Sequence, residues 1–134
     1  MRYPILALTL TTLIPLTSVA ADPLAEYVAA AQADTAGFSP SYERGKAFYN
    51  RQFGLSADMP GCYSCHSRDP RNSGEHVITG KGIRPMAVSA NPKRFTRMKK
   101  TEKWFRRNCR ELLERKCTAA EKANFITYLK GVQL

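Results

Sequence analysis

The feature that most constrains this chain is the run Cys62-Tyr63-Ser64-Cys65-His66. This C-x-x-C-H spacing is typical of covalent haem attachment. Two cysteines on one helical turn can each form a thioether with one of two neighbouring haem vinyl groups. The next residue, His66, then lies over the iron, where a neutral imidazole nitrogen can bind as the proximal ligand. The motif therefore predicts that the chain wraps around one covalent haem c.

Three other interpretations of the motif are open. A thioredoxin-like redox pair needs a βαβ context, which the sequence does not show. A zinc site needs four ligands, and Cys62, Cys65 and His66 supply only three crowded ones, with His76 as a distant fourth. A Cys62–Cys65 disulfide would be strained.

The N-terminus has the pattern of an export signal. Arg2 supplies a positive charge, and the apolar run 5–19 is shorter than the ~20 residues that span a bilayer. Small residues at Ala20-Ala21 suit signal peptidase. We expect residues 1–21 to be a cleaved signal peptide and residues 22–134 to form one domain in the periplasm.

The remaining pattern is all-α, with long loops in the middle. Strand-like alternation is absent over any useful length. A glycine- and proline-rich stretch, 68–92, is expected to be mostly irregular. The expected helices are 23–33, 42–53, a third from Glu102, capped by Thr101, to about Leu113, and a last one from the capping box Thr118-Ala-Ala-Glu121 to Gly131.

The chain is strongly basic, with 21 Lys and Arg against 11 Asp and Glu and a formal net charge of +10. The densest block is Lys93–Arg110. A basic surface can face nucleic acid, an anionic membrane or an acidic protein. The sequence carries no nucleic-acid-binding signature, and export argues against that role. An acidic redox partner is the better interpretation, with membrane association only through a partner.

The group opposite His66 decides what the iron does. The candidates are Met59, His76, Met86, Met98 and Asn108. Met86 follows Pro85 in a loop, as ligating methionines often do, and permanent His66/Met86 ligation would give an ordinary electron carrier.

Asn108 is less obvious but well placed. At about 100° per residue, with Trp104 at zero, Leu112 falls near 80° and Asn108 near 40°, inside the apolar arc. A buried amide without a partner costs ~1–3 kcal/mol, so its position needs a reason. A bond to a loop backbone and a role facing the iron are both open.

Cys109 and Cys117 remain as a natural pair in an exported protein. On one unbroken helix their Cα atoms would lie ~12 Å apart, whereas a disulfide needs less than ~7 Å. If they pair, the helix must end between them, close to Leu113.

Several runs together resemble the oxygen-binding class I cytochrome c family called sphaeroides haem protein. These runs are Glu43–Phe48, Cys62–His66, Thr79–Lys81, Ser89–Thr96, and Glu102–Cys109 continuing to Cys117-Thr118 and Glu121-Lys122. A tryptophan, then asparagine-cysteine, then a cysteine eight residues later is the most specific of these features.

The resemblance implies a small all-α class I cytochrome c fold, Asn108 as the distal ligand of ferric haem and a Cys109–Cys117 disulfide. It also implies that the asparagine leaves on reduction and opens a site for oxygen, nitric oxide or carbon monoxide. The implied electron donors are a dihaem cytochrome c or a membrane cytochrome b. Whether oxygen- or nitric-oxide-linked redox activity follows is open, as is competition from Met86.

Overall fold

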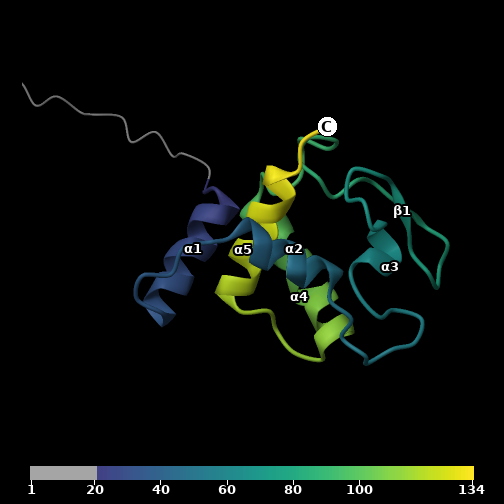
Figure 1. Cartoon of the computed structure of the whole chain (residues 1–134), viewed down its shortest axis with the longest axis horizontal. Coiled ribbons are helices and arrows are strands. Elements are labelled where there is room, and N and C mark those ends of the chain that lie inside the picture. The colour runs from purple at the N-terminus through teal and green to yellow at the C-terminus, as the bar shows by residue number, and fades with distance from the viewer. Residues whose placement is uncertain (1–20) are drawn as a thin grey trace, which may run out of the picture.

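The computed structural model describes residues 21–134, so the predicted signal peptide lies outside the described residues except for Ala21. Helices dominate this part of the chain, together with one very short antiparallel ladder (Figure 1). In chain order the elements are α1 (Pro23–Asp34), α2 (Tyr42–Asn50), α3 (Tyr63–His66), β1 (Gly74–Glu75), β2 (Gly82–Ile83), α4 (Met98–Leu113) and α5 (Ala119–Gly131). The all-α prediction is confirmed.

Helix α5 is the centre of the helical core and packs against both α1 and α2. Its inward residues include Ile126 and Leu129, which are completely buried. At the crossing with α2, a Cβ on Gly45 would lie 2.0 Å from the Asn124 carbonyl oxygen. A glycine is therefore required there for the two helices to approach each other.

The predicted starts of the first and last helices are confirmed. Asp22 accepts a hydrogen bond from the Leu24 N–H at the start of α1. Thr118 and Glu121 form the reciprocal capping box of α5. Both helices begin where a side chain satisfies backbone N–H groups that have no partner within the helix.

Two predicted boundaries were wrong. Helix α4 begins at Met98, one turn before the predicted Thr101 cap, and Thr101 is buried within the first turn. Lysine is a good helix former, and Met98 packs against the core, so the basic residues extend the helix. Helix α2 ends at Asn50 rather than Phe53, because the Phe53 N–H instead bonds the Pro60 carbonyl and closes a loop.

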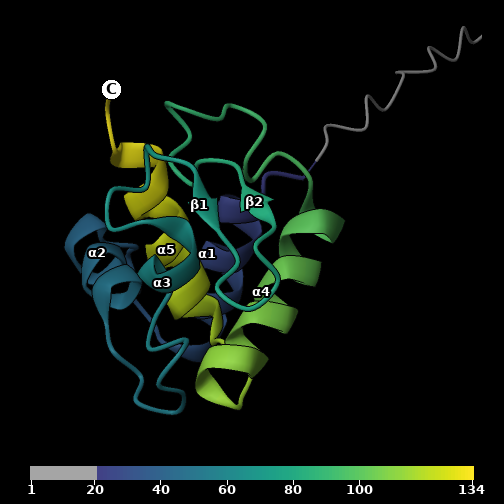
Figure 2. The ribbon, with the colours of Figure 1, turned by 90° about the vertical axis from the view of Figure 1, so that its right-hand side faces the viewer.

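Residues 51–97 form the non-helical side of the molecule, apart from the single turn α3. This segment lies in front of the helices in Figure 2 and on the side away from α1 in Figure 1. It includes the ladder that pairs Gly74 with Ile83 and Glu75 with Gly82, which sequence alternation did not predict. None of the helices in residues 21–134 is long and apolar enough to span a membrane.

Candidate functional site

The C-x-x-C-H motif forms one short helical turn. Cys62 is the N-cap of α3 with helical backbone angles, and the His66 N–H bonds the Cys62 carbonyl at 3.1 Å. Ser67 ends the turn with a φ of 66°. Cys62 and Cys65 therefore lie one turn apart, and neither thiol is in a disulfide. Cys62 and Cys65 are half-buried as whole residues. Burial of the Cys62 thiol raises its pKa to about 12.

His66 is the half-buried last residue of α3. Its Nδ1 atom is buried and has no hydrogen-bond partner in the structure. Burial, followed by the positive charge of Arg94 and the proximity of His76, lowers the pKa of His66 to about 4. The imidazole is therefore neutral at physiological pH, which is the form that binds metal. This chemistry fits a haem iron.

Two other residues fix the end of the turn. Tyr49 is completely buried on α2, and its hydroxyl lies within hydrogen-bond distance of the His66 and Ser67 carbonyl oxygens, at 3.0 and 2.6 Å. A Cβ on Gly74 would lie 1.9 Å from the Cys65 carbonyl oxygen, so β1 packs directly on the motif backbone. The sequence analysis missed Tyr49; its place four residues after Gly45, on the face that meets α5, was the available signal.

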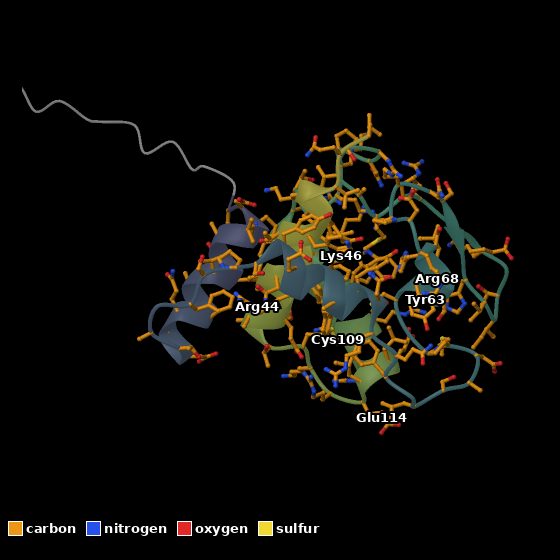
Figure 3. The ribbon with its side chains drawn as sticks, viewed as in Figure 1. Arg44, Lys46, Tyr63, Arg68, Cys109 and Glu114 are labelled. Atoms are coloured by element: carbon orange, nitrogen blue, oxygen red, sulfur yellow. A yellow bond between two sulfur atoms is a disulfide. The ribbon has the colours of Figure 1, made fainter. Side chains whose placement is uncertain are left out.

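The outer side of the turn carries an aromatic–cation contact. The Arg68 guanidinium carbon lies 4.2 Å from the centre of the Tyr63 ring. Both side chains are seen next to α3 in Figure 3. Such a contact stabilises by about 0.5–1 kcal/mol at an exposed site and restrains the chain that leaves the motif.

Asn108 lies near the C-terminal end of α4 and is half-buried. Its side-chain amide forms no hydrogen bond with another group in the described part of the chain. The next residue, Cys109, forms a disulfide with Cys117, with Cα atoms 5.6 Å apart. Helix α4 ends between them, and Glu114 takes a left-handed backbone conformation there (Figure 3).

The other candidate ligands lie in different surroundings. Met86 is 6% exposed and belongs to the apolar cluster that contains Cys109 and borders Cys62. His76 is turned into its own loop, where Nδ1 accepts long hydrogen bonds from the Ile78 and Thr79 N–H groups. Met59 and Met98 are half-buried.

Two cavities lie beside the helices. One, of about 290 Å³, lies between α2 and α5 and is lined by Arg44, Ala47, Phe48, Arg51, Glu121 and Asn124. The other, of about 160 Å³, is lined by Arg51, Phe53, Leu55, Leu113 and Arg115. Neither cavity is lined by a candidate haem ligand.

The chain matches known proteins over most of its length. Residues 35–129 match the family described as a domain of unknown function, DUF1924. Cytochrome c'' of Methylophilus methylotrophus is 45% identical over 92 residues, which is 68% of this chain and 64% of that protein. The match therefore spans slightly less than two thirds of that relative. The cytochrome c-type protein SHP of Cereibacter sphaeroides is 43% identical over 95 residues, covering 70% of this chain and 73% of that protein.

Solved structures of the same two proteins share the fold. The structure of oxidized SHP, described as an oxygen-binding cytochrome c, has a TM-score of 0.70 at 40% identity and covers 79% of this chain and 90% of its own. The solution structure of cytochrome c'', reported for its bearing on haem-ligand detachment, has a TM-score of 0.72 at 37% identity and covers 83% and 91%. The chain therefore belongs to the DUF1924 family and to the oxygen-binding class I cytochromes c of the sphaeroides haem protein type.

Proposed function

We propose that this protein is a periplasmic monohaem c-type cytochrome whose distal ligand depends on the oxidation state. Cys62 and Cys65 would hold the haem by two thioethers, and His66 would bind the iron. The observation that carries this proposal is the neutral, half-buried imidazole of His66, whose buried Nδ1 has no protein partner and which directly follows two unpaired cysteines on one turn. A haem bound there supplies one-electron redox chemistry and a coordination position for diatomic gases.

Asn108 is the proposed sixth ligand of the ferric state. Asn108 is half-buried, and its amide forms no side-chain hydrogen bond in the described part of the chain. The adjacent disulfide restrains the C-terminal end of α4. A neutral amide is a weak, hard ligand that ferric iron holds better than ferrous iron. If a haem iron is bound there, its reduction would free the Asn108 amide, whose N–H would then be available to donate to bound oxygen, nitric oxide or carbon monoxide. Ligand detachment in the related cytochrome c'' and oxygen binding by SHP support this behaviour.

The partners follow from the same proposal. A dihaem cytochrome c or a membrane cytochrome b would donate the electron, and the basic surface suits an acidic docking face. Export of residues 22–134 is tested by fractionating cells and sequencing the N-terminus of the mature protein. A mature chain that begins near Ala21 in the periplasmic fraction supports it, whereas an intact Met1 in the cytoplasm contradicts it.

Permanent ligation by Met86 is the second candidate function, that of a simple electron carrier. Burial of Met86 in the same apolar cluster that borders Cys62 favours it. The Met86 N–H also bonds the Pro70 carbonyl at 2.9 Å, which fixes the backbone at this position.

Visible spectra of matured protein in both oxidation states separate the two candidates. If Asn108 is the ligand, reduced protein is high-spin and binds carbon monoxide readily, and Asn108→Ala is high-spin in both states. Asn72→Ala, at an exposed position, is the matched control and should behave like wild type. A low-spin reduced spectrum that survives Asn108→Ala but not Met86→Ala would refute the first candidate.

A further inference from the structure

Helix α4 is tied to two other helices through one carboxylate oxygen. The Tyr27 hydroxyl of α1 donates to Oε2 of Glu102 at 2.6 Å. The Lys122 ammonium of α5 donates to the same oxygen at 2.7 Å. A single atom of α4 therefore contacts both neighbouring helices, and we call Glu102, Tyr27 and Lys122 the carboxylate clamp.

The carboxylate clamp joins a shielded ammonium group to a carboxylate that is open to water, since the Glu102 side chain is 42% exposed. The Lys122 side chain is only 12% exposed, and its Nζ lies 4.9 Å from the Tyr27 ring centre and 5.9 Å from that of Phe105. The aromatic rings limit access of water to the ammonium group. A charge-assisted bond in such surroundings is stronger and more restrictive than one on the surface.

The clamp and the disulfide hold α4 on either side of Asn108. Glu102 lies six residues before Asn108, about 9 Å along the helix axis at 1.5 Å per residue. Cys109 follows Asn108 directly and joins Cys117. In the described part of the chain, Glu102 is the residue of α4 whose side chain hydrogen-bonds to other helices. Arg107 bonds Glu111 within α4 itself.

Apolar contacts of α4 lie between these two ties. The Phe105 ring packs edge-on against Tyr27 at 5.7 Å and against Phe125 at 5.5 Å. Such ring contacts hold α4 close to the core but tolerate sliding and small rotations better than a hydrogen bond does. The angular setting of α4 is therefore restrained at Glu102 by the carboxylate clamp and at Cys109 by the disulfide.

The geometry points to Glu102 as a positioning residue: held by Tyr27 and Lys122, it sets the position of α4 from which Asn108 reaches the iron. This inference rests on the proposed function. Without the clamp the helix can shift, and the Asn108 amide spends more time away from the iron. Opening of the ferric site would then become easier, while the ligand itself is unchanged.

The test uses haem-loaded Glu102→Gln protein and the rate of cyanide binding to the ferric form, with the reduction potential as a second readout. Glutamine keeps the shape and removes the charge, so we expect cyanide to bind about tenfold faster and the potential to rise. Tyr27→Phe removes one donor and should move both readouts in the same direction by a smaller factor. Glu111→Gln breaks the exposed Arg107–Glu111 pair of the same helix and should leave both unchanged.

A double variant separates positioning from a general loss of stability. If Glu102 acts through Asn108, then Glu102→Gln/Asn108→Ala binds cyanide at the rate of Asn108→Ala alone. Additive effects, or a Glu102→Gln protein that is less stable but binds cyanide at the wild-type rate, would overturn the inference. If Glu102→Gln does not mature, Tyr27→Phe and Lys122→Met decide the question. Wild-type spectra in Asn108→Ala would instead refute the proposed ligation itself.

Discussion

The two cysteine-bearing regions of the chain differ in how much of their structure the polypeptide completes by itself. In residues 62–67, the proximal turn, both thiols are unpaired and the His66 Nδ1 has no hydrogen-bond partner. The turn depends on contacts from outside, chiefly the Tyr49 hydroxyl and the close approach of Gly74.

In residues 108–121, the distal elbow, protein groups satisfy one another at every named position except the Asn108 amide. Cys109 is bonded to Cys117, and Thr118 and Glu121 cap each other across the start of α5. Arg115 adds an ion pair to Glu121 at 2.7 Å. The comparison teaches that the two regions differ in what stabilises them: the proximal turn by contacts from other elements, and the distal elbow by its own covalent bond and capping residues.

Replacing both motif cysteines should have the largest effect and should act on the proximal turn. We expect Cys62→Ala/Cys65→Ala to lose covalent haem and to melt roughly 10–20 °C lower, because a tightly bound group stabilises only the folded state. Haem staining after denaturing electrophoresis and a melting curve measure the two effects. Ser64→Ala keeps both thiols and should retain the stain. Equal resistance of segment 51–97 to proteolysis in variant and wild type would show that the proximal turn does not need the group.

Removal of the disulfide should have the next largest effect and should act on the distal elbow. In the chain-entropy model, closing this loop stabilises by about 2.5 kcal/mol, so Cys109→Ala/Cys117→Ala should lower the free energy of unfolding in urea by about that amount. Haem attachment should be unaffected. A double variant that loses haem but keeps its unfolding free energy would mean that the disulfide supports haem attachment rather than stability.

The Tyr49 hydroxyl tests whether the proximal turn depends on outside contacts. Tyr49→Phe removes the hydroxyl that lies within hydrogen-bond distance of the His66 and Ser67 carbonyl oxygens and should cost about 1–2 kcal/mol of unfolding free energy. Tyr42→Phe is the matched control, because Tyr42 is 36% exposed. Urea unfolding of both variants measures the difference. Equal free energies of unfolding would show that the Tyr49 hydroxyl does not stabilise the proximal turn.

The smallest effect is expected at the cap of α5. Thr118→Ala removes the acceptor for the Glu121 N–H and should cost about 1 kcal/mol. Thr79→Ala, at an exposed loop position, is the control. A loss as large as that of the disulfide variant would mean that the cap, rather than the covalent bond, maintains the distal elbow.

Sequence reasoning worked where a local pattern carries its own physics. The capping residues Asp22 and Thr118 and the all-α class follow from chain-local hydrogen bonding and periodicity. It failed at the start of α4, because helix propensity in a lysine-rich run does not mark a boundary when no cap is present. It missed the bonds of Tyr49 and the Glu102–Tyr27 bond, because a local pattern does not show which distant residue a side chain contacts. The ligand roles of His66, Asn108 and Met86 remain predictions.

Burial of the Cys62 thiol determines how readily it reacts before and after the chain folds. A thiol whose pKa is about 12 in the folded chain is almost entirely protonated and reacts slowly as a nucleophile. In an unstructured chain the same thiol is exposed to water and its pKa is close to the ordinary value. Any covalent attachment proposed at Cys62 would therefore be faster before Gly74 packs against the motif backbone than after it.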